Sequence, residues 1–178
     1  MDEGVELDYL APERFRQAYT LLEAAGIELS ADEWIGYAER LHGRRQGGDA
    51  GIVTLGTGGG YIYGLFAFTI DRGGTTAAPL LNCEYFLTGG LPGRFVASQL
   101  AKAVEELAKR NRCGEISIAL AGPAAINAVM QALPPFDVLD KSYAVTKVVV
   151  ARRLFAADGA SAVTDAAGVA APSGTPQD

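Results

Sequence analysis

The fold of this chain is decided by the stretch Leu80–Ala121, LLNCEYFLTGGLPGRFVASQLAKAVEELAKRNRCGEISIALA. It opens with an apolar run, Leu80–Thr88, passes through a Gly/Pro turn, and closes with a second apolar run, Glu115–Ala121. Apolar runs bounded by Gly and Pro are typical of buried strands, and the amphipathic segment between them is typical of a helix. The stretch therefore predicts a strand–loop–helix–strand unit. The free N–H groups at the start of such a helix form a ready anion-binding site.

The helix of this unit is expected over residues 94–112, with Gly114 ending it. Its apolar positions recur every three or four residues and face the sheet: Val96, Leu100, Val104, Leu107 and Ala108. Charged residues of both signs occupy the opposite face, as expected for a face in water.

Three strands and two helices are expected before this unit. The strands cover Val5–Leu10, Ile52–Leu55 and Tyr61–Ile70, and the helices cover residues 12–25 and 30–42. Ser30 and Glu33 have the S-x-x-E spacing of a capping box, which starts the second helix. Trp34 belongs to its apolar stripe and is expected in the core.

The Gly-rich segment 56–60, GTGGG, is interpreted as a hairpin turn rather than a nucleotide loop. Phosphate loops of the Walker and Rossmann types are followed by a helix, whose N-terminus faces the anion. Here the next residues are YIYGLFAFTI, a strand pattern rich in aromatic residues.

After the central unit, the sequence predicts a short helix over Ala124–Leu133, a brief strand over Phe136–Leu139 and a last strand over Tyr143–Leu154. The segment 156–178 holds no Lys, Arg or aromatic residue, so we expect it to be disordered. The expected organisation is one domain over residues 1–155 and a tail over 156–178.

Composition argues against several classes of function. The net charge of −6 argues against a nucleic-acid partner, which would need clustered Lys and Arg. No apolar segment approaches the ~20 residues of a membrane span, and the acidic start MDEGVELDY shows no signal peptide. The two cysteines, Cys83 and Cys113, lack metal-ligand spacing, so no metal is expected. A cytoplasmic, reducing location is the simplest interpretation.

The element order over residues 5–154 resembles the GNAT superfamily of acyl-CoA-dependent N-acetyltransferases. The resemblance implies an α/β (α+β) fold: a mixed, mostly antiparallel sheet with helices on both faces. It also implies acetyl-CoA, or another acyl-CoA, as co-substrate and a small-molecule amine as acceptor. In this fold the helix pair within residues 13–41 shapes the acceptor site.

The family's Q/R-x-x-G-x-G/A loop, which wraps the pyrophosphate of CoA, aligns with residues 92–97. Pro92 stands where Gln or Arg is usual, Phe95 replaces the first Gly, and only Ala97 fits. A Gly there lets the backbone approach phosphate oxygens without a side chain in the way. By resemblance, the pyrophosphate-binding residues are Gly93, Arg94, Phe95, Val96 and Ala97.

The resemblance also places a backbone amide of Tyr85, Phe86 or Leu87 at the acetyl oxygen. Asn127 matches the Asn that the family carries on the helix after the fifth strand. Gln131 occupies the position of the family's Tyr, which protonates the CoA thiolate, and glutamine cannot donate that proton.

Glu84 is the candidate base because it is the only acidic residue in the body of its strand. The alternative is that Glu84 merely faces water or pairs with an Arg. Tyr61, Tyr63 and Tyr85 are candidates to line an acceptor cleft, or else to pair across strands as core residues.

Two functions remain open. One is an N-acetyltransferase, and the other is a catalytically inactive GNAT-like module that binds another ligand or forms a homodimer surface, for which the sheet edge beside the last strand is the candidate. An open gap between the strands around Glu84 and Ile116 would favour the enzyme, and a filled gap the inactive module.

Overall fold

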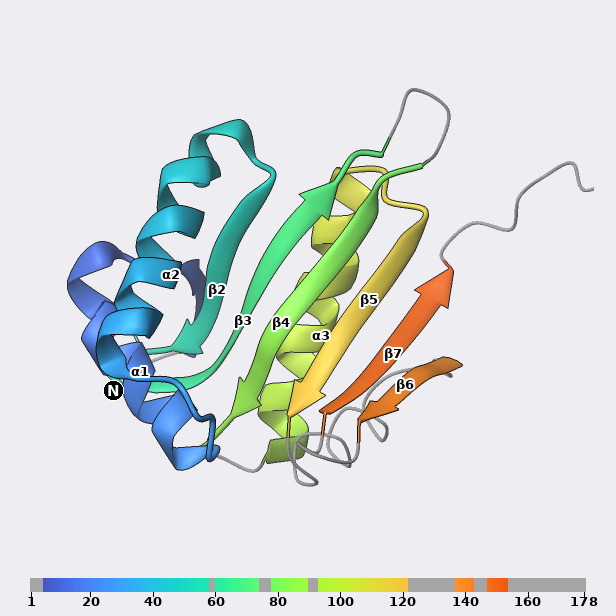
Figure 1. Ribbon diagram of the computed structural model, residues 1–178. Helices are drawn as coiled ribbons and strands as arrows, with labels where there is room; N and C mark the ends of the chain where they lie inside the picture. Colours follow the sequence, from blue (N-terminus) through green and yellow to red (C-terminus); the bar gives the residue numbers. More distant parts are fainter. Residues whose placement is uncertain are drawn as a thin grey trace, which may run out of the picture.

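The computed structural model describes residues 5–57, 60–73, 78–89, 93–121, 137–142 and 147–153. In this part the strands form one sheet in the order β1-β2-β3-β4-β5-β7-β6 (Figure 1). The strands are β1 (Glu6–Tyr9), β2 (Ala50–Gly56), β3 (Ile62–Asp71), β4 (Leu80–Thr88), β5 (Glu115–Ala121), β6 (Asp137–Ser142) and β7 (Lys147–Arg153). The helices are α1 (Phe15–Ala24), α2 (Ala31–Arg44) and α3 (Gly93–Arg110).

The sheet is mixed, as the sequence predicted. β4 and β5 pair in parallel, with α3 as the crossover between them, and the other described pairs are antiparallel. A parallel pair needs a long connection, and the 18 residues of α3 provide it. In the strand order, β4 and β5 are neighbours near the centre of the sheet.

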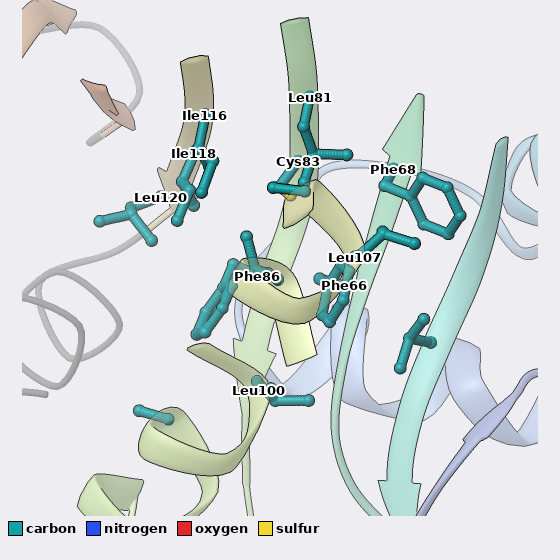
Figure 2. Packing of buried hydrophobic residues seen from close by; sticks show 14 of the residues in the cluster. Phe66, Phe68, Leu81, Cys83, Phe86, Leu100, Leu107, Ile116, Ile118 and Leu120 are labelled. Atoms are coloured by element: carbon teal, nitrogen blue, oxygen red, sulfur yellow. The ribbon is translucent and has the colours of Figure 1, made fainter. Parts of the chain in front are cut away.

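Helices cover both faces of the sheet, which confirms the expected layering (Figure 1). α1 and α2 lie on one face over β2 and β3, and α3 lies on the other. Each face has its own buried core. Figure 2 shows the core under α3, in which the labelled side chains are Phe66, Phe68, Leu81, Cys83, Phe86, Leu100, Leu107, Ile116, Ile118 and Leu120.

The capping box that starts α2 is confirmed. The backbone N–H of Glu33 donates to the Ser30 hydroxyl oxygen at 3.3 Å, and the Ser30 N–H donates to the Glu33 carboxylate at 2.9 Å. Trp34 is fully buried on the next turn, and its indole N–H donates to the Phe15 carbonyl at 2.8 Å. This bond fixes α2 against the start of α1.

Three expectations are corrected at the element ends. The first turn after Ala11 is a 3₁₀ turn, Pro12–Arg14, and α1 begins only at Phe15. α3 runs over Gly93–Arg110 rather than 94–112, because Asn111 and Arg112 form a turn that leads to the buried Cys113. β6 reaches Ser142, three residues beyond the expected strand end.

The last strand is also placed differently from the expectation. β7 lies between β5 and β6, so it is an interior strand, and β1 and β6 are the edges of the described sheet. The predicted helix Ala124–Leu133 and the predicted tail 156–178 lie outside the described residues. No helix among the described residues is long and apolar enough to cross a membrane.

Candidate functional site

A β-bulge interrupts β4 at its midpoint. Leu65 of β3 pairs with Leu87 and Ala67 pairs with Glu84, so two residues of β4, Tyr85 and Phe86, stand opposite one residue of β3. Tyr85 has a φ of 50°, which is rare for a residue with a side chain. The bulge reverses the alternation of β4, and bulges commonly re-aim side chains beside active sites.

The consequence of the bulge is visible in the two cores. Leu81, Cys83 and Phe86 all belong to the core under α3, although the spacing from 83 to 86 is odd. Tyr85 instead packs with the core under α1 and α2. The extra residue therefore keeps Phe86 buried and places Tyr85 beside Glu84 on the side of α2.

The pairing of β4 with β5 ends just before the bulge. It runs from Leu80–Glu115 to Cys83–Ile118 and stops there, although β4 continues to Thr88 and β5 to Ala121. Beyond Ile118, β5 still pairs with β7 on its other side. The β4 backbone from Glu84 onward therefore has no ladder partner on the side of β5.

The sequence left open whether the two strands separate around Glu84 and Ile116, and the strand pairing answers this differently at the two residues. Ile116 pairs with Leu81, so the strands are joined at that level. The separation begins after Ile118 because the bulge at Tyr85 turns β4 out of register with its parallel neighbour.

The backbone N–H groups in the first turn of α3 have no carbonyl acceptor within the helix itself. Within it, Phe95 is 46% exposed, whereas Val96 and Ala97 are fully buried against the sheet. The Phe95 ring is thus at the surface and does not fill the core. Gly93 and Arg94 lie in this turn, and the side chain of Arg94 lies outside the described part. Backbone amides at a helix N-terminus are donors that suit an anionic phosphate.

Glu84 lies at a small cluster of aromatic side chains and contributes a carboxylate to it. Its side chain is exposed, and the Tyr37 hydroxyl donates to its Oε2 at 2.9 Å. The Tyr37 ring stacks on Trp34 with centroids 5.9 Å apart and meets the Tyr85 ring edge-on at 5.3 Å. Burial, and then the charge of Glu84, raises the pKa of Tyr37 well above its usual range and also raises the pKa of Tyr85. Both phenols therefore stay protonated as donors at neutral pH.

Tyr37 is the residue that the sequence did not reveal. It stands three positions after Trp34 on α2, where an aromatic side chain is equally typical of a core residue. Its contact with Glu84 joins residues 47 positions apart, and no local pattern encodes that distance.

The other candidates are distributed differently from the expectation. Tyr61 is 75% exposed, and Tyr63 packs against the core under α3, on the opposite side from Tyr85. The three tyrosines therefore do not share one cleft. Asn127 and Gln131 lie outside the described residues.

Neither cysteine is suited to nucleophilic chemistry. Cys83 and Cys113 are both buried in the core under α3, and burial raises the pKa of each thiol. Among the described residues, no cluster of His, Cys, Asp and Glu could hold a metal ion.

Two surface grooves lie elsewhere on the described part of the molecule. One, of about 430 Å³, lies between the start of α1 and α2, and the other, of about 330 Å³, lies between β1 and α3. Neither is lined by β4 or β5. The bulge and the helix start are therefore separate from both grooves.

Comparison with solved structures identifies the fold. A putative acetyltransferase of Salmonella typhimurium, yncA, solved with acetyl-CoA, matches with a TM-score of 0.62 at 11% identity, over 89% of this chain and 98% of that one. An S. typhimurium acetyltransferase that modifies the N-terminal serine of ribosomal protein L7/L12 matches with a TM-score of 0.64 at 15% identity, over 85% and 95%. A GNAT-family acetyltransferase of Streptococcus pneumoniae matches with a TM-score of 0.58 at 11% identity, over 84% and 99%. No protein-family model and no curated protein sequence matches the chain. The chain therefore has the GNAT fold, reached by a divergent sequence.

Proposed function

We propose that this GNAT-fold chain is an acyl-CoA-dependent N-acetyltransferase that acts on a small-molecule amine. The observation that carries the proposal is the end of β4–β5 pairing at Cys83 and Ile118, beside the bulge at Tyr85. A fold without such a site has no need of a central strand that lacks a ladder partner on one side, because unpaired backbone groups are costly there. The fold comparisons support the same reading.

The binding of the co-substrate would use backbone groups. The backbone amides of the first turn of α3, from Gly93 to Phe95, would donate hydrogen bonds to the pyrophosphate at the positive end of the helix dipole. An amide of Tyr85, Phe86 or Leu87 would donate to the acetyl oxygen from the unpaired part of β4. Backbone donors do not depend on side-chain identity, so they are present even though the usual Gly motif is not.

Acetyl transfer to the neutral amine forms a C–N bond, breaks the C–S bond of the thioester and moves one proton from nitrogen to sulfur, so that the products are an N-acetylated amine and the CoA thiol. An acceptor that arrives as an ammonium ion must first lose one further proton, and Glu84 would accept it, directly or through water. Its carboxylate is exposed on the side of α2, and the Tyr37 hydroxyl fixes its orientation.

The test is calorimetry followed by a transfer assay. We expect acetyl-CoA to bind the wild-type chain and Glu84→Gln alike, because the carboxylate does not contact the pyrophosphate. Acetylated product, detected by mass spectrometry over a panel of amines, should fall by roughly 10²–10⁴-fold in Glu84→Gln, the usual contribution of a positioned base. Absence of acetyl-CoA binding at millimolar concentration would overturn the proposal.

One observation favours the alternative, an inactive module. Phe95 places a half-exposed ring on the first turn of α3, where the family has the first Gly of its loop. The variant Phe95→Gly separates the two functions. Acetyl-CoA binding that appears only in Phe95→Gly would show that the wild-type site is closed, whereas equal binding in both proteins supports the enzyme.

The partners follow from the charge balance. With a net charge of −6, the chain is suited to a small amine rather than to a nucleic acid, whose phosphates would be repelled. A homodimer stays a prediction, and the edge strands β1 and β6 are the places where a second copy would extend the sheet.

A further inference from the structure

Tyr37 separates two opposite charges on the side of the sheet that carries α2. At its hydroxyl end lies the Glu84 carboxylate, 2.9 Å away. At its ring lies the Arg40 guanidinium, whose Cζ is 6.0 Å from the ring centroid. Arg40 is about one turn further along α2. The Glu84 carboxylate and the Arg40 guanidinium therefore both contact the Tyr37 side chain.

The ring between these charges is held in place. Trp34 stacks on it with an interplanar angle of 29°, and Tyr85 meets it at 75°. Trp34 is itself fixed by its indole bond to the Phe15 carbonyl. The Tyr37 ring, which lies between the two charged groups, is thus held in place by its packing.

Both charges are without an ionic partner in the described part of the chain. The salt bridges there join Arg72 with Asp49 and Lys109 with Glu105. Glu84 and Arg40 are both exposed. Each therefore keeps its charge available to a ligand, and a ligand that binds both must carry one positive and one negative group.

We propose that the acceptor is a zwitterion, an amine that also carries a carboxylate, as in a free amino acid. Its ammonium group would lie at Glu84, next to the part of β4 that has no partner in β5, and its carboxylate would lie at Arg40. This inference rests on the proposed function for the identity of the reacting amine. A guanidinium can bind a carboxylate through two parallel hydrogen bonds, whereas it repels an acceptor that carries only an amine.

The experiment compares matched probes by NMR titration of the ¹⁵N-labelled protein without co-substrate. L-Leucine, L-phenylalanine and L-methionine are each tested beside their methyl esters and decarboxylated amines. We expect at least one amino acid to bind roughly ten-fold more tightly than its ester, the scale of one charge-assisted hydrogen-bond pair. Arg40→Gln should remove that preference, and Arg44→Gln, one turn further along α2, should keep it.

Because Arg40 is exposed, Arg40→Gln should keep the fold, which circular dichroism checks. Equal affinity for acid and ester in the wild-type chain overturns the inference, and so does a preference that survives in Arg40→Gln. Failure of the proposed function is a separate result: acetyl-CoA would not bind, while the amino-acid titration would still be readable.

Discussion

At the scale of single residues, Gly64 of β3 sets how closely α3 can approach the sheet. A Cβ at this position would lie 2.5 Å from Val96 Cγ1 and 2.8 Å from the Leu87 carbonyl oxygen. The carbonyl belongs to the backbone and cannot move aside without disturbing β4. Gly64→Ala should therefore lower the free energy of unfolding by about 1–3 kcal/mol, the usual cost of overpacking. Urea unfolding measures it.

The matched control is Gly43→Ala in α2, where an added Cβ meets nothing within 4 Å. Alanine is the better helix former, so this variant should be as stable as the wild type or gain up to about 1 kcal/mol. Equal unfolding free energies for the two variants would show that α3 does not need Gly64.

A second residue-scale prediction concerns Tyr37 at high pH. Its pKa is raised by burial and by the Glu84 charge, so the native state holds the phenolic proton more tightly than the unfolded state. Below about pH 10, the ordinary pKa of tyrosine, this contribution to stability is complete. Above it, the unfolded chain loses the proton first, and the free energy of unfolding falls as the pH rises.

Tyr37→Phe should make this fall shallower between about pH 9 and pH 11, because the variant has no phenol to titrate. The control Tyr61→Phe should keep the wild-type slope, since Tyr61 is 75% exposed. Urea unfolding at each pH gives the slopes. A wild-type slope in Tyr37→Phe would mean that Tyr37 is not buried against Glu84.

At the scale of elements, the bulge of β4 is the feature on which the proposed site depends. Deleting Tyr85 would restore regular alternation and still place Phe86 on the side of α3. The regular strand would then pair with β5 beyond Cys83 and close the opening. We expect a folded protein whose affinity for acetyl-CoA is at least roughly ten-fold lower, because the donors of β4 are consumed by the ladder.

Tyr85→Ala is the control for this deletion, because it removes the ring and keeps the extra residue. Calorimetry with acetyl-CoA should give near wild-type affinity for Tyr85→Ala. If the deletion variant binds acetyl-CoA as tightly as Tyr85→Ala does, the bulge has no part in the site.

The elements themselves could be predicted from the sequence, and the bulge could not. Apolar alternation and the Gly/Pro turns located β3, β4, β5 and α3 to within about two residues. The run CEYFL is apolar enough on both sides to fit a regular strand or a bulged one. What decides between them is which of Tyr85 and Phe86 faces α3, and that depends on packing across the sheet rather than on local sequence.

The same dependence on packing decided which residues of the candidate site could be predicted from the sequence. Glu84 could be identified because it is an isolated acid in an apolar strand. Tyr37 and Arg40 could not, because their relation to Glu84 is set by how α2 lies on the sheet. The first turn of α3 was located from the Gly/Pro turn, but the exposure of Phe95 depends on the depth at which α3 packs.

At the scale of the whole molecule, the two cores lie on opposite faces of one sheet and should unfold together. Trp34, the single tryptophan, reports on the core under α1 and α2, and Phe86 lies in the other core. Phe86→Ala should cost about 3–5 kcal/mol, and Phe86→Leu less. The fluorescence midpoint of Trp34 should shift as far as the midpoint by far-UV circular dichroism. Separate midpoints would show that the faces unfold independently.

The burial of both cysteines has a practical consequence. Cys83 and Cys113 are at most 1% exposed, and they are the only thiols of the chain. A sulfhydryl reagent should therefore react with the native protein only when the core beneath α3 opens. The labelling rate would report the free energy of that opening. A small thiol released into solution would react much faster than the buried cysteines, so the reagent would detect it with little signal from the protein.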